Sequence, residues 1–286
     1  MNSPAAEAPP HPSLTQDAVA VVTGAASGIG FAAAQRFASL GLRVCMADLG
    51  GEKLQAAHAA LRDAGHDVLA APCDVANRAE LKSLAATVAQ NLGPVSVLMN
   101  NAGIQPGSTI FDDVGNWDRI LAVNLGGIIA GSQIFAPAMV ASGKPGLIIN
   151  TGSKQGITTP PGDPAYNIAK AGVKVFTEAL QHDLRGRQGC HVEARLFIPG
   201  FVFTPLTANG RAEKPSGAWT PDETVDYLFA ALARDDFYIL CPDHDVDRAL
   251  DAKRVLWAAG DIAENRPPLS RWHPDFVEVF KDWLSA

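Results

Sequence analysis

A short apolar run at residues 18–23 is followed directly by the glycine-rich segment 23–30 (TGAASGIG), after which an alanine-rich helical pattern begins. Glycine permits a tight turn at the end of a strand, lets the backbone approach a ligand closely, and allows a helix to pack near that strand. The N–H groups at the start of such a helix are free to bind phosphate oxygens. A strand, this turn and a helix in that order therefore predict a dinucleotide-binding unit at the beginning of the fold.

The same alternation of short apolar runs and longer amphipathic segments continues along the chain. Most runs are apolar throughout, which is typical of parallel strands covered on both faces. Strands are predicted at 18–23, 43–47, 67–71, 95–99, 146–150, 191–197 and 237–240, and helices at 29–40, 52–64, 78–91, 117–141, 164–188 and 221–234. This order predicts an α/β fold, a doubly wound (Rossmann) parallel seven-stranded sheet with helices on both faces.

Both ends of the chain depart from this alternation. Residues 1–16 are rich in Pro and Ala and lack a basic start and an apolar run, so we expect a flexible N-terminal tail and not a secretory signal. Residues 17–241 form the predicted dinucleotide-binding and catalytic domain. Residues 242–286 are predicted to be a helical C-terminal extension that packs on the same domain or on a partner subunit, since its aromatic residues suit either environment.

Composition narrows the class of partner. The 286 residues carry a formal net charge of −7, which argues against nucleic acid and anionic membranes as main partners. The longest apolar stretch, 128–141, is interrupted by polar residues and a proline, so no membrane span is expected. The four cysteines form no C-x-x-C pair and are expected to be free thiols, which fits a cytoplasmic protein.

Tyr166 and Lys170 lie four residues apart in the helix predicted at 164–188, so they share one face of that helix. A cation close to a phenol favours the phenolate, so Lys170 is predicted to lower the pKa of Tyr166 from its usual value near ~10. A phenol that exchanges a proton is what a carbonyl needs when it accepts a hydride. Ser153, thirteen residues upstream, follows a predicted strand and joins this pair. Taken alone, the spacing of Tyr166 and Lys170 is equally typical of ordinary helix surface.

Asp48 ends the second predicted strand, 18 positions after Gly30. A carboxylate at this position can accept hydrogen bonds from adenosine ribose hydroxyls and repels a 2′-phosphate. No Arg or Lys occupies 25–27 or 49–51 to attract that phosphate. The sequence therefore predicts NAD over NADP, and the alternative is a solvated aspartate at the end of a strand.

These segments together resemble the short-chain dehydrogenase/reductase family over about residues 17–240. Residues 23–30 match its T-G-x-x-x-G-x-G turn, 100–103 its N-N-A-G motif, 166–170 its Y-x-x-x-K motif and 199–204 its P-G-x-[VI]-x-T segment. The resemblance implies that the cofactor is bound by Gly24, Ser27, Gly28, Ile29, Gly30, Asp48, Leu49, Asp74, Val75, Asn101, Ala102, Gly103, Tyr166, Lys170, Pro199, Gly200, Val202 and Thr204.

The resemblance also implies an activity, that of an NAD-dependent oxidoreductase acting on a secondary alcohol or ketone. Its catalytic residues would be Asn124, Ser153, Tyr166 and Lys170. Ser153 would orient the substrate oxygen and Tyr166 would transfer the proton. Lys170 would bind the nicotinamide ribose as well as act on Tyr166, and Asn124 would hold a water that connects Lys170 to solvent. The family further implies a homodimer or homotetramer.

The substrate is predicted to contact Ser153, Gln155, Tyr166 and Phe201. The surrounding residues are mostly apolar, which favours a hydrophobic or aromatic small molecule, while Lys154 and Arg211 leave an acidic substrate open. Two other functions stay open on the same fold: a non-enzymatic NAD(H)-binding regulator, and an epimerase or dehydratase that uses bound NAD.

Other kinds of site are disfavoured. Thr151 occupies the first glycine position of a G-x-S-x-G elbow around Ser153, which argues against a hydrolase triad. The histidines show no H-x-x-x-H spacing, so no metal site is expected. Residues 243–247 (DHDVD) are acidic, but they lack a glycine-containing calcium loop, and a solvated loop is favoured over a cation site.

Overall fold

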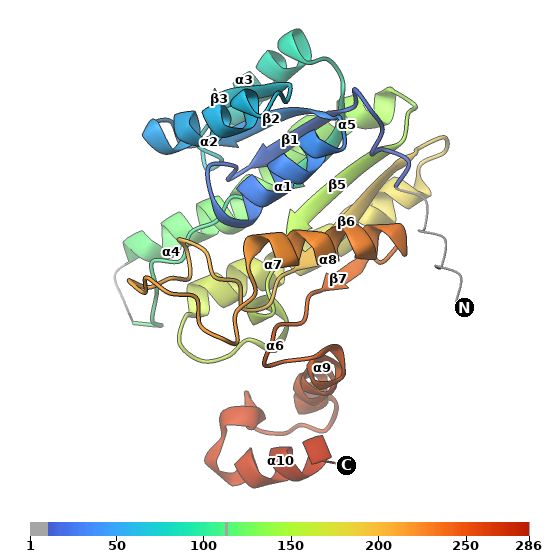
Figure 1. Cartoon of the computed structure of the whole chain (residues 1–286). Coiled ribbons are helices and arrows are strands. Elements are labelled where there is room, and N and C mark those ends of the chain that lie inside the picture. The colour runs from blue at the N-terminus through green and yellow to red at the C-terminus, as the bar shows by residue number, and fades with distance from the viewer. Residues whose placement is uncertain (1–10, 112–113, 286) are drawn as a thin grey trace, which may run out of the picture.

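A computed structural model of the chain describes residues 11–111 and 114–285. Its centre is a seven-stranded sheet in the order β3-β2-β1-β4-β5-β6-β7, in which every neighbouring pair is parallel (Figure 1). The strands are β1 (Val19–Thr23), β2 (Arg43–Asp48), β3 (Val68–Pro72), β4 (Val95–Asn100), β5 (Gly146–Thr151), β6 (Val192–Ile198) and β7 (Tyr238–Leu240). The predicted doubly wound fold is confirmed, because uninterrupted apolar runs mark strands that are buried on both faces.

Helices cover both faces of the sheet. One face packs against α1 (Gly28–Ser39), α2 (Glu52–Asp63) and α8 (Pro221–Ala233), and the other against α3 (Arg78–Asn91), α5 (Gly127–Ala141) and α7 (Pro164–Gly186). Side chains of β1 alternate between the two cores, Val22 lying in the first and Val21 in the second. This alternation follows from the two-residue period of a strand. Because helices cover both faces of the sheet, the carboxyl ends of the strands are left to form the site.

The helix predicted at 117–141 differs from a regular α-helix. It consists of α4 (Val114–Leu121), the π-helical segment η1 (Ala122–Gly126) and α5. The span Gly115–Ala141 is long and apolar enough to cross a membrane by length and composition. However, α5 packs against β4 and β5 and supplies core residues such as Phe135, so it is an internal helix of this fold.

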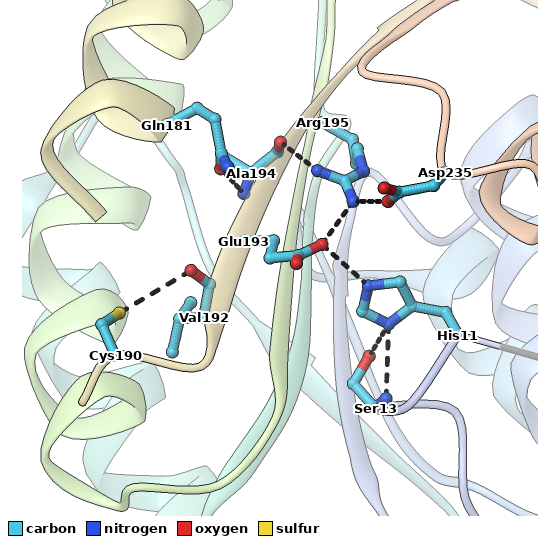
Figure 2. A network of polar contacts seen from close by, with 9 residues as sticks. All are labelled: His11, Ser13, Gln181, Cys190, Val192, Glu193, Ala194, Arg195 and Asp235. Carbon is cyan, nitrogen blue, oxygen red and sulfur yellow. Dashed lines mark hydrogen bonds and ion pairs between the residues drawn. The ribbon is translucent and has the colours of Figure 1, made fainter. Parts of the chain in front are cut away.

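The N-terminal segment from residue 11 onward packs against the domain, so the predicted boundary of a flexible tail at residue 16 is wrong for the part that the structure describes. Leu14 joins the core on the face covered by α1, and His11 is also buried. The His11 ring contacts the Glu193 carboxylate at 3.3 Å, and Glu193 in turn pairs with the buried Arg195 of β6 (Figure 2). Composition suggested flexibility, whereas these contacts across the sequence fix the segment. The first ten residues lie outside the described part.

The C-terminal extension forms a small helical lobe beyond the sheet (Figure 1). It contains α9 (Arg248–Ala263), the short 3₁₀ segments η2 (Ser270–Trp272) and η3 (Pro274–Phe276), and α10 (Val277–Ser285). Trp257 forms the centre of this lobe, with Phe280 at 5.0 Å between ring centroids. The lobe joins the main domain where α9 contacts the short helix α6 (Gln155–Thr158), which follows Ser153.

Candidate active site

A cavity of about 540 Å³ opens at the carboxyl ends of the parallel strands. It spans the boundary between β1 and β4, where the strand order reverses and where α/β folds bind their ligands. The cavity brings together predicted residues from segments that are far apart in the sequence: Gly24, Ser27, Gly28, Ile29, Asp48, Leu49, Asp74, Val75, Asn101, Ala102, Gly103, Ser153, Gln155, Tyr166, Lys170, Pro199, Gly200, Phe201, Val202 and Thr204. Of the residues predicted to line the site, Gly30 and Asn124 do not.

The glycine-rich turn after β1 has the backbone that its sequence predicted. Gly24 and Gly28 have φ angles of 70° and 55°, a region that favours glycine. Gly30 is not among the residues that line the cavity, and its contact with a cofactor stays a prediction. A Cβ atom on Gly30 would lie 2.0 Å from the carbonyl oxygen of Gly24. Gly30 therefore acts by letting α1 start close against the turn, which leaves the other glycines exposed to the cavity.

Asp48 lines the cavity and also holds the turn. Its carboxylate accepts hydrogen bonds from the Ala26 N–H at 2.9 Å and from the Leu49 N–H at 2.7 Å. Asp74 lines the same end. Among the described lining residues, the basic ones are Lys154 and Lys170, which come from the segment after β5 and from α7. The end of the cavity near β2 and β3 is therefore acidic.

Tyr166 and Lys170 share one face of α7 as predicted, and both side chains are buried. The Lys170 ammonium donates to the Thr151 carbonyl at 2.8 Å and lies 5.7 Å from the centre of the Tyr166 ring. A hydrogen bond joins the Tyr166 phenol to the Ser153 hydroxyl. Close packing of α6 on α7 brings these groups together, because a Cβ on Gly156 would lie 2.4 Å from the Lys170 backbone.

The pKa of Tyr166 differs from the prediction. Burial raises the pKa of Tyr166 to about 12, and the hydrogen bond from Ser153 offsets only part of this effect. Burial also lowers the pKa of Lys170 to about 8. The sequence revealed a cation near a phenol, but it did not reveal that both groups lose their contact with water. In the protein alone, loss of hydration is the largest effect on Tyr166, and the phenol keeps its proton at neutral pH.

Asn124 is fully buried in η1, behind the wall of the cavity. Its side-chain oxygen accepts from the Ile104 N–H and its side-chain amide donates to the Ile104 carbonyl, both at 2.8 Å. The side chain therefore fixes the segment that follows the N-N-A-G motif. The role of Asn124 in holding a water that connects Lys170 to solvent stays a prediction.

Lys154 reveals two site residues that sequence reasoning missed. Its ammonium lies 3.1 Å from the Asp243 carboxylate and 2.7 Å from the Asp251 carboxylate of α9. Asp243 was expected in a solvated loop, but its side chain is buried and also accepts from the Phe201 N–H at 3.3 Å. The C-terminal lobe therefore holds two segments of the cavity wall. Asp243 lies 89 residues from Lys154 in the sequence, so no local pattern could have indicated the pair.

Comparison with known proteins gives consistent matches. Residues 18–215 match the sequence model described as short chain dehydrogenase. The chain is 33% identical over 248 residues to 1-deoxy-11-beta-hydroxypentalenate dehydrogenase of Streptomyces avermitilis. The aligned region covers 85% of this chain and 91% of that enzyme.

Solved structures agree with these sequence matches. A short chain dehydrogenase/reductase from Burkholderia phymatum in complex with NAD superposes with a TM-score of 0.81 and 31% identity, covering 90% of this chain and 97% of that chain. A metagenomic short-chain oxidoreductase in complex with NADP superposes with a TM-score of 0.63 and 32% identity, covering 77% and 92%.

Proposed function

The chain belongs to the short-chain dehydrogenase/reductase family, and from this premise we propose that it is an NAD-dependent oxidoreductase acting on secondary alcohols or ketones. The observation that carries the proposal is the shared cavity, in which Ser153, Tyr166 and Lys170 lie beside the glycine-rich turn after β1. A regulator that only binds a dinucleotide has no use for a phenol hydrogen-bonded to a serine next to a buried lysine.

The cavity fits a nicotinamide dinucleotide in shape and in chemistry. Its volume lies within the range of small-molecule sites. Gly24 and Gly28 line it without side chains beside the start of α1, where backbone N–H groups suit a pyrophosphate. Asp48 and Asp74 make the adenosine end acidic, which favours ribose hydroxyls over a 2′-phosphate. Since structural relatives bind NAD or NADP, this local charge is the argument for NAD.

Four side chains of the chain take part in the proposed reaction. The bound nicotinamide supplies or accepts the hydride. Ser153 donates a hydrogen bond to the substrate oxygen and orients it. Tyr166, protonated at neutral pH in the protein alone, gives its proton to the oxygen of a ketone, or takes the proton of an alcohol in the reverse direction. Lys170 holds a positive charge near that oxygen and binds the ribose next to the nicotinamide. Asn124 fixes the wall at Ile104, which positions the substrate.

The substrate side of the cavity is mainly apolar, which supports a hydrophobic or aromatic alcohol or ketone. Ile104, Phe201 and Leu206 line it. The polar exceptions include Gln105 and Gln155, whose side chains contact each other at 3.4 Å and can bind one polar group of the substrate. Lys154 is paired with two carboxylates, so it does not by itself select an acidic substrate in this cavity.

The test is turnover with defined cofactors. The protein is mixed with NADH or NADPH and a panel of hydrophobic ketones, and loss of absorbance at the nicotinamide band is followed. The proposal predicts ketone-dependent oxidation of NADH, faster than that of NADPH. Tight NADH binding without turnover of any ketone or alcohol would favour a regulator. Product formation without net change in NADH would instead favour an epimerase or dehydratase.

Two further proposals concern the state of the protein. Ile168 and Val175 are exposed apolar residues on α7, which supports a homodimer or homotetramer with α7 at the contact. Light scattering coupled to size exclusion measures the assembly, and a monomer would contradict it. The four cysteines are free, three of them buried, which supports a cytoplasmic location. Cell fractionation tests the location.

A further inference from the structure

A second cavity, of about 290 Å³, lies between α6 and the C-terminal lobe. It shares two lining residues, Lys154 and Gln155, with the cavity of the candidate active site. Lys154 and Gln155 therefore belong to the walls of both cavities, and Tyr166 lines the first of them.

Two arginines of the C-terminal lobe line this second cavity, Arg254 of α9 and Arg271 of η2. Across the described residues, no carboxylate forms an ion pair with either guanidinium, whereas Arg266 of the same lobe pairs with Asp261 at 3.1 Å. The Nε atom of Arg254 is buried and has no hydrogen-bond partner among the described residues. Burial and the neighbouring charge of Arg254 lower the pKa of Arg271, so the two cations are close enough to repel each other.

The charge balance around the cavity is positive. Lys154 neutralises Asp243 and Asp251 only in part, because it carries one charge against two. With Arg254 and Arg271 included, three cations face two carboxylates, which leaves one positive charge uncompensated. Arg254 and Arg271 are partly buried, and the Arg271 guanidinium lies over the rings of Trp272 and Phe280. Neither has a carboxylate partner among the described residues, so the cavity is suited to an anion that supplies one. This uncompensated charge lies inside a chain whose formal net charge is −7.

The remaining walls of the cavity are largely apolar. Ile157, Leu240, Val255 and Trp272 line it. Planar guanidinium groups bind a carboxylate through two parallel hydrogen bonds, and apolar walls suit the hydrocarbon chain attached to it. We propose that this second cavity binds the carboxylate of a hydrophobic monoacid through Arg254 and Arg271. This inference rests on the proposed function where it makes the acid part of the substrate, whose ketone or alcohol would lie at Tyr166.

The first arm of the test measures binding without catalysis. Calorimetric titration of the full chain with hexanoate, and with 1-hexanol as the uncharged match, should show binding of the acid only. Arg254→Gln and Arg271→Gln should each weaken hexanoate binding by about 10-fold or more, the usual effect of losing a charged hydrogen bond. Arg254→Lys should retain part of the affinity. The control is Arg248→Gln, which removes an exposed charge of α9 that does not line the cavity.

The second arm measures turnover with methyl ketones that carry a terminal carboxylate on chains of increasing length, each compared with its methyl ester. At the chain length that spans both cavities, kcat/KM for the acid should exceed that for the ester by about 10-fold or more. Both arginine variants should bring this ratio towards one, and Arg248→Gln should keep it. Arginine-dependent hexanoate binding without an acid preference at any length would support the site and assign it to a separate carboxylate ligand.

The proposal is overturned if hexanoate does not bind, or if binding and acid preference are the same in the variants as in the wild type. Failure of the proposed oxidoreductase function would give a different set of results. In that case neither acid nor ester is reduced at any chain length, while arginine-dependent binding of hexanoate persists and supports the carboxylate site.

Discussion

Replacing Lys170 with Met should stabilise the protein without bound ligand while abolishing its activity. Burial lowers the pKa of Lys170 from 10.5 to about 8, and one pKa unit corresponds to about 1.4 kcal/mol. The buried charge therefore costs on the order of 3 kcal/mol at pH 7, where both folded and unfolded chains hold the proton. Methionine removes this cost but also removes the hydrogen bond to the Thr151 carbonyl, worth about 1 kcal/mol. The expected net gain in the free energy of unfolding is about 2 kcal/mol.

The pH dependence of this gain has a definite sign. Between pH 8 and 10.5 the unfolded chain binds more protons at Lys170 than the folded chain, so the wild type gains stability as the pH rises through this window. The Lys170→Met variant lacks this gain. Its advantage should therefore shrink from pH 7 to pH 10 and end in a small deficit from the lost hydrogen bond. Buried cysteines and tyrosines also titrate at high pH, but they contribute equally to both proteins and cancel in the difference.

The assay is urea unfolding of wild type and variant, followed by circular dichroism at fixed protein concentration and at several pH values. NADH-dependent ketone reduction is measured on the same samples. A variant less stable than the wild type at pH 7, or a stability difference that does not change with pH, would refute the argument that burial of Lys170 is costly.

Three other changes test separate parts of the structure. Asp48→Asn should reduce the preference for NADH over NADPH in kcat/KM by about 10-fold or more, since it removes the charge that repels a 2′-phosphate; an unchanged ratio would exclude Asp48 from cofactor choice. Gly30→Ala should lower the free energy of unfolding by about 1–3 kcal/mol and weaken NADH binding, because its Cβ would meet the Gly24 carbonyl. The control Gly186→Ala has open space around the new Cβ and should not lower the thermal unfolding temperature. Burial lowers the pKa of His11, so the unfolded chain takes up a proton at this residue before the folded chain does as the pH falls below about 6.5. The free energy of unfolding of His11→Gln should therefore fall less than that of the wild type in this range. Parallel profiles of unfolding free energy against pH for the two proteins would contradict the burial of His11.

The sheet and most of the cavity wall could be predicted because their signals are local. Apolar runs mark buried strands, and the glycine-rich turn and the tyrosine–lysine spacing each lie within a single segment. In a parallel sheet the carboxyl ends of the strands lie at one edge, so the order of the motifs along the chain already places them together. Local signals also include helix starts, such as Thr220, whose side chain and that of Glu223 form a capping box at the beginning of α8.

The features that could not be predicted depend on contacts between distant segments. The pairing of Lys154 with Asp243 and Asp251 joins the segment after β5 to the C-terminal lobe. Asn124 binds a backbone segment twenty residues away and lies in a π-helical turn, whose five residues are too few to change the apolar periodicity visibly. The pKa of Tyr166 depends on how completely the folded chain excludes water from it, which spacing alone does not reveal.

The central claim is that the Tyr166 phenol exchanges the proton of the reaction beside a bound nicotinamide. Tyr166→Phe tests it most directly, because phenylalanine fills the same buried space without the hydroxyl. The account predicts that NADH binding, followed by its fluorescence, stays within a few-fold of wild type, while kcat for ketone reduction falls by roughly 100-fold or more. Ketone reduction at a rate close to wild type in this variant would contradict the claim.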